Sequence, residues 1–506
     1  MSVRHGSLSI NSENIFPIIK KWHYSDHDIF FRELISNGCD AITKLKKLEM
    51  MGEYSFPENY KNKIQVVVNP EEKTLKFIDT GLGMDADEVE EYINQIAFSG
   101  ATDFLEKYKD KTNEDQIIGH FGLGFYSAFM VADEVHIDTL SYKAGATAVH
   151  WECDGGTEFS MTDGDRTEVG TTITLFLNEE SVEFANEYRA REVIQKYCSF
   201  MPTEIYLSKE GEEKKEDEEE TSLSDTAPLW TKHPNECEKE QYLEFYRKVF
   251  HDYKEPLFWI HLNMDYPFNL KGILYFPKIN TEYDSIEGTI KLYNNQVFIA
   301  DYIKEVIPEF FMLLKGVIDC PDLPLNVSIS ALQNDGFVNK ISDYITKKVA
   351  DRLSGMCKTQ RDDYENYWDD INPFIKFGCI KDEKFSGKMM DYILYKDIDG
   401  KYHTLKDMLP EKEVVEEKDD EKKPTTIFYV TDELQQSQYI NMFRQEGKNA
   451  VILRHNIDGA FVTHVERANE TVHFQRIDAD LTDDFKEAVS EEELKETTDT
   501  LTELFR

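Results

Sequence analysis

One segment near the N-terminus constrains the fold more than any other. Residues 30–45, FFRELISNGCDAITKL, have the spacing of an amphipathic helix. Its apolar side chains recur on one side: Phe31, Leu34, Ile35, Ile42 and Leu45. The other side carries Glu33, Asn37 and Asp40, at i, i+4 and i+7. Two interpretations stay open here: an ordinary solvated face, or a row of general base, metal ligand and hydrogen-bonding partner.

Length and charge exclude several classes of protein. A chain of 506 residues is too long for one core and predicts about two to four domains. The net charge of −41 argues against binding to nucleic acid or to an anionic membrane. Because the sequence has no membrane-length apolar run and no apolar leader after Met1, we expect a cytoplasmic protein. The seven cysteines form no CxxC pair and are expected to be reduced.

The N-terminal part, residues 1–208, is predicted to be an α+β domain with helices on one face of an antiparallel sheet. Strand-like runs at 65–68 and 75–79 flank a turn at 69–71, which predicts a hairpin. Ser25 or Asp26 is a plausible cap for the central helix. Further helices are expected at 85–104 and 128–132, and further strands at 134–139, 146–152 and 171–177.

The remainder is predicted to be a second, α/β domain reached through an acidic linker at 209–227, which cannot pack a core. Strand-like runs are present at 426–430 and 450–453, and the charged run 411–423 is expected to be a surface loop. The predicted subdivisions are a larger unit at 228–357, a helical connector at 358–380 and a smaller unit at 381–490.

Two glycine-bearing segments indicate a nucleotide site. The first is DTGLGM, with Asp79, Gly81, Gly83 and Met84, and the second contains Gly119, Gly122 and Gly124. Neither is a Walker loop or a dinucleotide fingerprint, and each alone would only shape a turn. Together, a carboxylate at a strand end can accept from an exocyclic amine, and glycines can admit a ligand or present N–H groups to phosphates. The Thr171 hydroxyl would complete the base site.

These segments carry a family resemblance. RELISNGCDA, DTGLGM, IGHFGLGFYSAF and VGTTI resemble the four nucleotide-site motifs of the ninety-kilodalton heat-shock chaperone family, bacterial high-temperature protein G type. Past the linker, DYPFNLKGILYFPK, IKLYNNQVFIADYIKEVIPEF and LKGVIDCPDLPLNVSISALQ resemble its middle domain. The resemblance implies a Bergerat-type ATPase domain followed by an α/β middle domain. It also implies an ATP-dependent chaperone that uses ATP and Mg²⁺ and acts on unfolded client proteins.

Residue roles follow from the same resemblance. Glu33 matches the general base, Asn37 the magnesium ligand and Asp79 the adenine contact. Other pocket positions are matched by Asp40, Met84, Phe125 and Thr171. The segment from about 94 to 124 resembles a lid over ATP, and the loop 323–333 resembles one that reaches the γ-phosphate, with Asn326 and Gln333 matching.

The sequence departs from the family in that loop. Ile329 stands where the family usually has an arginine, and isoleucine offers no donor to the γ-phosphate. The lid differs as well, at Tyr92, Phe98 and His120. An alternative function is therefore a nucleotide-binding switch with impaired hydrolysis.

Residues 491–506 match the start of the family's C-terminal dimerisation domain. Full-length members are homodimers, so we expect this chain to be a monomer or at most a weak dimer. Other members of the ATPase superfamily fit less well: a histidine kinase needs a phospho-accepting helix pair, and a topoisomerase needs a basic surface for DNA.

Overall fold

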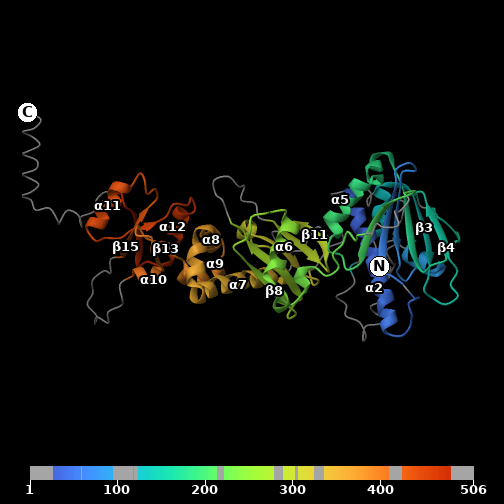
Figure 1. Cartoon of the computed structure of the whole chain (residues 1–506), viewed down its shortest axis with the longest axis horizontal. Helices are drawn as coiled ribbons and strands as arrows, with labels where there is room; N and C mark the ends of the chain where they lie inside the picture. Colours follow the sequence, from blue (N-terminus) through green and yellow to red (C-terminus); the bar gives the residue numbers. More distant parts are fainter. Residues whose placement is uncertain are drawn as a thin grey trace, which may run out of the picture. The chain divides into compact units, whose positions relative to one another are not determined.

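The computed structural model describes residues 27–58, 60–94, 118, 124–156, 158–212, 221–278, 289–301, 306–323, 336–409 and 424–479. These residues form two compact units, both drawn in Figure 1. The first unit holds the described residues of Met1–Pro277, Gly288–Ile307 and Leu314–Lys340, and the second holds those of Lys278–Glu287, Pro308–Leu313 and Ile341–Arg506. The domain boundaries predicted at 208 and 228 stay predictions.

A seven-stranded sheet organises the N-terminal part of the first unit, in the order β5-β4-β3-β6-β2-β1-β7. Its strands are β1 (Lys63–Asn69), β2 (Thr74–Asp79), β3 (Ala132–Leu140), β4 (Val149–Cys153), β5 (Ser160–Asp163), β6 (Gly170–Leu177) and β7 (Glu204–Lys209). All neighbours are antiparallel except β1 and β7. The predicted hairpin is confirmed as β1–β2, and its register places Asp79 between Ile64 and Thr171.

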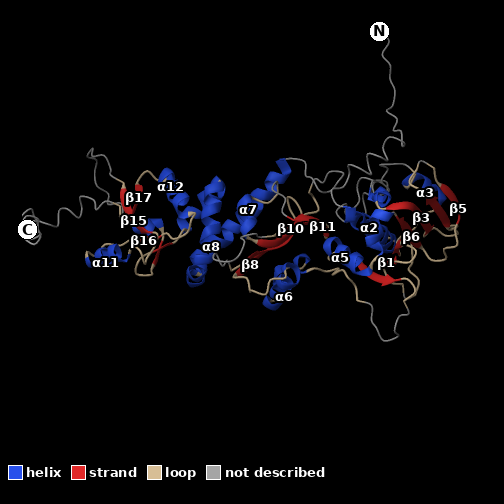
Figure 2. Ribbon diagram, turned by 90° about the horizontal axis from the view of Figure 1, so that it is seen from above, coloured by secondary structure: helices blue, strands red, loops and turns tan. Residues whose placement is uncertain are grey.

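Helices pack against this sheet, which confirms the predicted α+β class. They are α2 (Phe30–Met50), α3 (Ala86–Tyr92) and α5 (Glu187–Cys198), with the 3-10 helices η1 (His27–Ile29), η3 (Gly124–Met130) and η4 (Glu179–Ala185). Figure 2 shows α2 and α5 beside the strands. Phe30 and Phe31 of α2 are fully buried and meet Phe77 of β2 edge to face, with ring centroids 6.2 and 5.4 Å apart. The apolar side of α2 therefore builds the core, as its spacing predicts.

Three local predictions need correction. Helix α2 begins at Phe30 after Ile29, which makes no side-chain cap, while residues 25 and 26 lie outside the described part. The helix predicted at 85–104 ends at Tyr92, with Ile93 and Asn94 already in a turn and the rest outside the described residues. The helix predicted at 128–132 is confirmed only in part, because the 3-10 helix η3 ends at Met130. Ala132 pairs with Leu177 in the sheet, so strand pairing outweighs the helical tendency of a short apolar run.

A second sheet completes the first unit, in the order β11-β10-β12-β9-β8. Its elements are η5 (Leu229–Thr231), η6 (Pro234–Glu236), α6 (Lys239–Phe250), β8 (Phe258–Met264), β9 (Leu270–Phe276), β10 (Ile290–Asn294), β11 (Val297–Asp301) and β12 (Lys315–Asp319). Fully buried Trp230 donates its indole N–H to Asp319 Oδ2 at 3.1 Å. Within the predicted linker, the Leu223 amide donates to the Ile205 carbonyl of β7 at 2.8 Å, so its described end, 221–227, is bound to the unit.

The second unit is helical at first and then α/β. Its elements are η7 (Glu309–Leu313), α7 (Gly336–Thr359, whose first residues belong to the first unit), α8 (Arg361–Lys381), α9 (Glu383–Met389), η8 (Met390–Tyr392), β13 (Tyr395–Lys396), β14 (Tyr402–His403), α10 (Leu405–Met408), β15 (Thr425–Val430), α11 (Ser437–Gln445), β16 (Val451–Ile452), α12 (Asp458–Ala468) and β17 (Val472–Arg476).

Strand β15 pairs in parallel with both β16 and β17, and this confirms the strands expected at 426–430 and 450–453. Parallel pairing requires crossover connections, which α11 and α12 supply here. Within the described ranges, no helix combines the length and apolar character needed to cross a membrane.

Candidate nucleotide site

Helix α2 presents its polar row to the interior rather than to water. Glu33 is 8% exposed and Asp40 6%, while Asn37 is half-buried. The helix touches the β1–β2 hairpin at Gly38, where a Cβ would lie 3.2 Å from the Asp79 Cβ and 3.1 Å from Ile64 Cδ1. The interpretation of this row as an ordinary solvated face is therefore wrong.

Arg32 holds one oxygen of Glu33. Its Nη2 and Nε donate to Glu33 Oε1 at 2.8 and 3.1 Å, and its Nη1 donates to the carbonyl of Phe298 in β11 at 3.4 Å. Arg32 is only 1% exposed, so this ion pair is screened little by water. Glu33 Oε2 faces Gly124, where a Cβ would come within 2.7 Å of it. Arg32 is not among the residues predicted from the sequence, because an arginine inside a helix gives no signal of burial.

Asp79 is a buried carboxylate at the end of β2. Its Oδ1 accepts from the Gly81 amide at 2.8 Å. Burial raises the pKa of Asp79 from 3.8 to about 6. The Gly81 amide, the positive charge of Arg166 and the Thr171 amide lower this pKa but do not offset the effect of burial. Arg166 also donates through Nη2 to the Asp79 carbonyl at 3.4 Å. The site therefore contains a buried acceptor whose pKa is raised by its burial.

The glycines of the DTGLGM loop have a packing reason. Gly83 has φ +62°, and a Cβ there would lie 1.9 Å from the Leu140 carbonyl oxygen. At Gly81, a Cβ would lie 2.4 Å from the Cβ of Ala41 in α2. The loop is thus wedged between α2 and the end of β3, and only glycine fits. Direct ligand contact at these two positions stays a prediction.

Thr139 joins segments that the sequence analysis treated separately. Its fully buried hydroxyl accepts from the Met84 amide at 2.9 Å and lies 3.0 Å from Thr171 Oγ1. It also donates to the Gly170 carbonyl at 3.3 Å. Thr139 is not among the residues predicted from the sequence, although the alternation of β3, with Val135 and Ile137 buried, places it on the inner face.

The remaining predicted residues are only partly described. The Asp40 carboxylate accepts from the Ile118 amide at 2.8 Å, and Phe125 is buried with its ring 6.0 Å from that of Trp151. The other glycines of that motif, the rest of the lid and the loop residues lie outside the described part: Gly119, Gly122, Asn326, Ile329 and Gln333. Their assignments stay predictions.

The predicted magnesium ligand fits a hard cation. Asn37 is half-buried, and its side chain has no hydrogen bond to the residues that the structure describes. An accessible amide oxygen beside a buried carboxylate row is a ligand type that Mg²⁺ accepts, with phosphate oxygens and waters filling its other positions.

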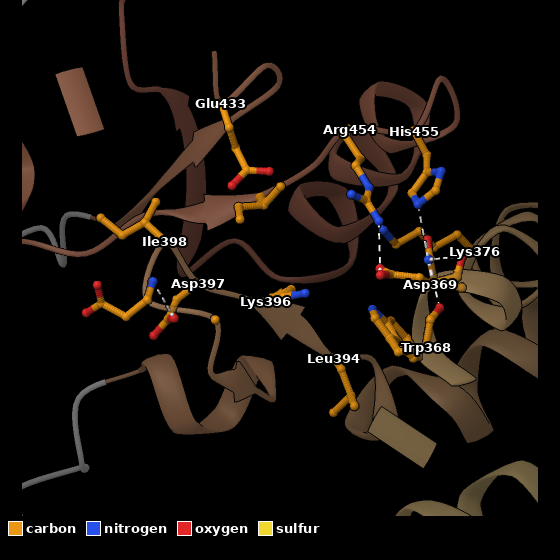
Figure 3. Close-up of a pocket in the computed structure, with 14 residues that line it drawn as sticks. Trp368, Asp369, Lys376, Leu394, Lys396, Asp397, Ile398, Glu433, Arg454 and His455 are labelled. Atoms are coloured by element: carbon orange, nitrogen blue, oxygen red, sulfur yellow. Dashed lines mark hydrogen bonds and ion pairs between the residues drawn. The ribbon is translucent and has the colours of Figure 1, made fainter. Parts of the chain in front are cut away.

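A separate cavity of about 320 Å³ lies in the second unit (Figure 3). It is bounded by α8, by the β13–β14 turn and by the segment after β16. Two of its charged side chains are paired: Arg454 binds Asp369 at 3.0 Å, and Lys376 Nζ donates to buried Asp458 at 2.5 Å. Burial lowers the pKa of Lys376 and of His455. None of the residues predicted to bind nucleotide lines this cavity.

Two family profiles match the chain. Residues 30–158 match the profile described as histidine kinase-, DNA gyrase B- and HSP90-like ATPase, and residues 218–506 match that of the Hsp90 protein. The first range contains α2, β1, β2, Thr139 and Ile118, the residue at which the second glycine-bearing segment begins.

Curated proteins agree with these profiles over most of the chain. The chain is 44% identical to chaperone protein HtpG of Bacteroides fragilis over 485 residues, which cover 95% of this chain and 70% of that protein. It is 43% identical to chaperone protein HtpG of Porphyromonas gingivalis, over 94% of this chain and 70% of that one. Chaperone protein HtpG of Desulfitobacterium hafniense is 34% identical, over 71% of this chain and 58% of that protein.

Proposed function

The chain belongs to the Hsp90 protein family, and we propose that it is an ATP-dependent molecular chaperone. In this proposal the N-terminal part binds Mg-ATP, and closure of the lid and of the domains couples hydrolysis to the handling of client proteins. Family membership supports the chaperone function, and the match to the ATPase profile supports ATP hydrolysis.

One observation carries the assignment of the site. The polar row of α2 lies against the end of β2 at which Asp79 stands, because Gly38 lets the helix approach the strand to contact distance. Buried carboxylates are costly unless they have a partner or a function. Glu33 has a partner in Arg32, whereas the charge of Asp79 is opposed by burial. A nucleotide base with an exocyclic amine would give Asp79 a donor.

Each residue of the site then has a role. Asp79 accepts from the adenine amine, with the Thr139–Thr171 pair fixing the neighbouring wall. Asn37 holds Mg²⁺, which would neutralise phosphate charge. Glu33 orients the attacking water through Oε2, because Oε1 is held by Arg32. We further propose that the protein acts in the cytoplasm on unfolded or partly folded clients and binds neither nucleic acid nor membranes.

The full chain tests this function. We expect Mg-ATP binding in calorimetry, ATP turnover, and ATP-dependent suppression of the aggregation of a chemically denatured client. Glu33→Gln should keep nucleotide affinity and lose turnover, since glutamine can still accept from Arg32 but cannot take a proton from water. Unchanged turnover in Glu33→Gln would remove Glu33 from the chemistry, and absence of nucleotide binding would refute the proposed site.

A second candidate function rests on Ile329. An arginine that contacts a transferring phosphoryl group is worth about 10³ to 10⁵ in rate in other enzymes, and isoleucine has no such donor. This favours a nucleotide-binding switch whose hydrolysis is slow. Ile329→Arg should raise the single-turnover rate at saturating ATP and leave ATP affinity about the same. The rate should rise by less than that factor if domain closure limits turnover. Equal rates for the two proteins would exclude this alternative.

A further inference from the structure

The outer face of the seven-stranded sheet carries a mixed cluster that the proposed function does not use. On β3, the residues Glu134, His136 and Asp138 point away from the core, because Val135 and Ile137 between them are buried. On β4, the same alternation turns His150 and Glu152 outward. The two strands lie side by side in Figure 1.

Strand register brings these side chains together. His136 is directly opposite Glu152, and Asp138 is directly opposite His150, so the two histidines are diagonal neighbours. Their rings lie 5.2 Å apart at the centroids. The histidine side chains are 21% and 29% exposed, which leaves them accessible from solvent but fixed by neighbours.

Both imidazoles direct the same nitrogen at one oxygen. His136 Nε2 lies 3.8 Å and His150 Nε2 3.6 Å from Glu152 Oε2. The ligand atoms of these three residues all lie within 4.8 Å of one another. Two bonds of about 2.1 Å in tetrahedral geometry place ligand atoms about 3.4 Å apart. The three side chains are half-buried, and small rotations of them therefore suffice to bring the three atoms around one ion.

The neighbouring carboxylates supply what such a site needs next. His150 Nδ1 lies 2.7 Å from Asp138 Oδ1 and donates its proton to that oxygen. The lone pair of His150 is then on Nε2, which faces the cluster. Glu134 Oε1 lies 2.7 Å from His136 Nε2, so this nitrogen carries a proton in the metal-free chain. A bound ion would replace that proton, and Glu134 would then be close enough to become a further oxygen ligand. If the two histidine–carboxylate pairs were independent, nothing would require both histidines to approach the same Glu152 oxygen. Their shared approach to that oxygen favours one common site.

We propose that this face binds a divalent transition-metal ion of the zinc type through His136, His150 and Glu152, with Glu134 as a further ligand and Asp138 as a positioning residue. Two imidazoles select such ions over Mg²⁺ and Ca²⁺, which prefer oxygen alone. The ion would join β3 to β4 on the side of the sheet opposite to Thr139, so the site is distinct from the proposed nucleotide site.

The test uses the full chain after treatment with a chelator. Titration with Zn²⁺ in calorimetry, and with Co²⁺ as an optical probe, is expected to give one site whose absorption spectrum is that of a four-coordinate ion. His136→Gln and His150→Gln should each abolish that spectrum, and Asp138→Asn should weaken Zn²⁺ binding about tenfold while keeping the stoichiometry.

The matched control is His473→Gln. His473 also pairs with a carboxylate, Glu466 at 3.1 Å, but is outside any such cluster in the described residues, so its replacement should leave Zn²⁺ and Co²⁺ binding unchanged. Circular dichroism of each variant separates loss of a ligand from loss of fold. Glu152→Gln removes a proposed ligand by a smaller change of side chain and should also weaken Zn²⁺ binding. A wild-type chain that binds no Co²⁺, or histidine variants that bind it as the control does, would overturn the proposal.

Discussion

Replacing Asp79 with asparagine is expected to stabilise the nucleotide-free chain while weakening nucleotide binding. Burial raises the pKa of Asp79 from 3.8 to about 6. At about 1.4 kcal/mol for each pH unit, this difference corresponds to about 3 kcal/mol, the cost of keeping the carboxylate ionised in the folded chain. Asparagine keeps an oxygen for the Gly81 amide and carries no charge, so Asp79→Asn removes most of that cost.

The stabilisation expected of Asp79→Asn should depend on pH. Between about pH 4 and pH 6 the folded chain holds the Asp79 proton more tightly than the unfolded chain, so the free energy of unfolding of the wild type falls as pH rises through that window. Asp79→Asn lacks this titration. Its advantage should be about 3 kcal/mol near pH 8 and should vanish near pH 4.

Binding should change in the opposite direction. The adenine amine would lose a charged acceptor, which is worth about 1.5–3 kcal/mol, so ATP affinity should fall about tenfold to a hundredfold. Urea unfolding of both proteins at several pH values measures the first effect, and calorimetry with Mg-ATP near pH 8 measures the second.

Asp319 offers a matched control in the same unit. Burial raises its pKa from 3.8 to about 6, and its carboxylate accepts from Trp230 and from the Gln296 amide, in the second sheet. Asp319→Asn should therefore give a similar, pH-dependent gain in stability with unchanged ATP affinity. An Asp79→Asn chain that is no more stable than the wild type near pH 8, or whose advantage does not depend on pH, would refute the reasoning.

Three other changes test the packing of the nucleotide site and of the cavity in the second unit. Thr139→Val deletes the acceptor of the loop amide and should lower ATP affinity about tenfold, whereas Thr139→Ser should restore it; isothermal titration distinguishes them. Gly124→Ala places a methyl group 2.7 Å from Glu33 Oε2 and should slow single-turnover hydrolysis more than it weakens ADP binding. Lys376→Met leaves buried Asp458 without its cation and should cost about 3–5 kcal/mol in urea unfolding; adding Asp458→Asn should recover much of that loss, and no recovery would argue against the pair.

The sequence alone determined what depends on local spacing. The helical period placed Phe31, Leu34 and Ile35 on one face of α2 and Glu33 and Asn37 on another, and the protein has that helix. The strand period and the turn at 69–71 likewise defined the β1–β2 hairpin and put Asp79 at its end. The two faces of α2 and the β1–β2 hairpin depend on residues that are close together in the sequence. A short stretch of sequence is therefore enough to predict them. The end of the helix expected at 128–132 was misplaced for the complementary reason: η3 ends at Met130, and Ala132 is a strand residue because it pairs with Leu177.

Only the tertiary structure decided which side chains meet. Arg32, the partner of buried Glu33, also donates to the Phe298 carbonyl, far along the chain. The role of Thr139 depends on β3 pairing with β6, and the convergence of His136 and His150 on Glu152 depends on the register between β3 and β4. A shift of one residue in that register would place the two histidines on opposite faces of the sheet. Contacts of this kind are fixed by how strands pair and how a helix packs on them, and no periodicity within one segment records them.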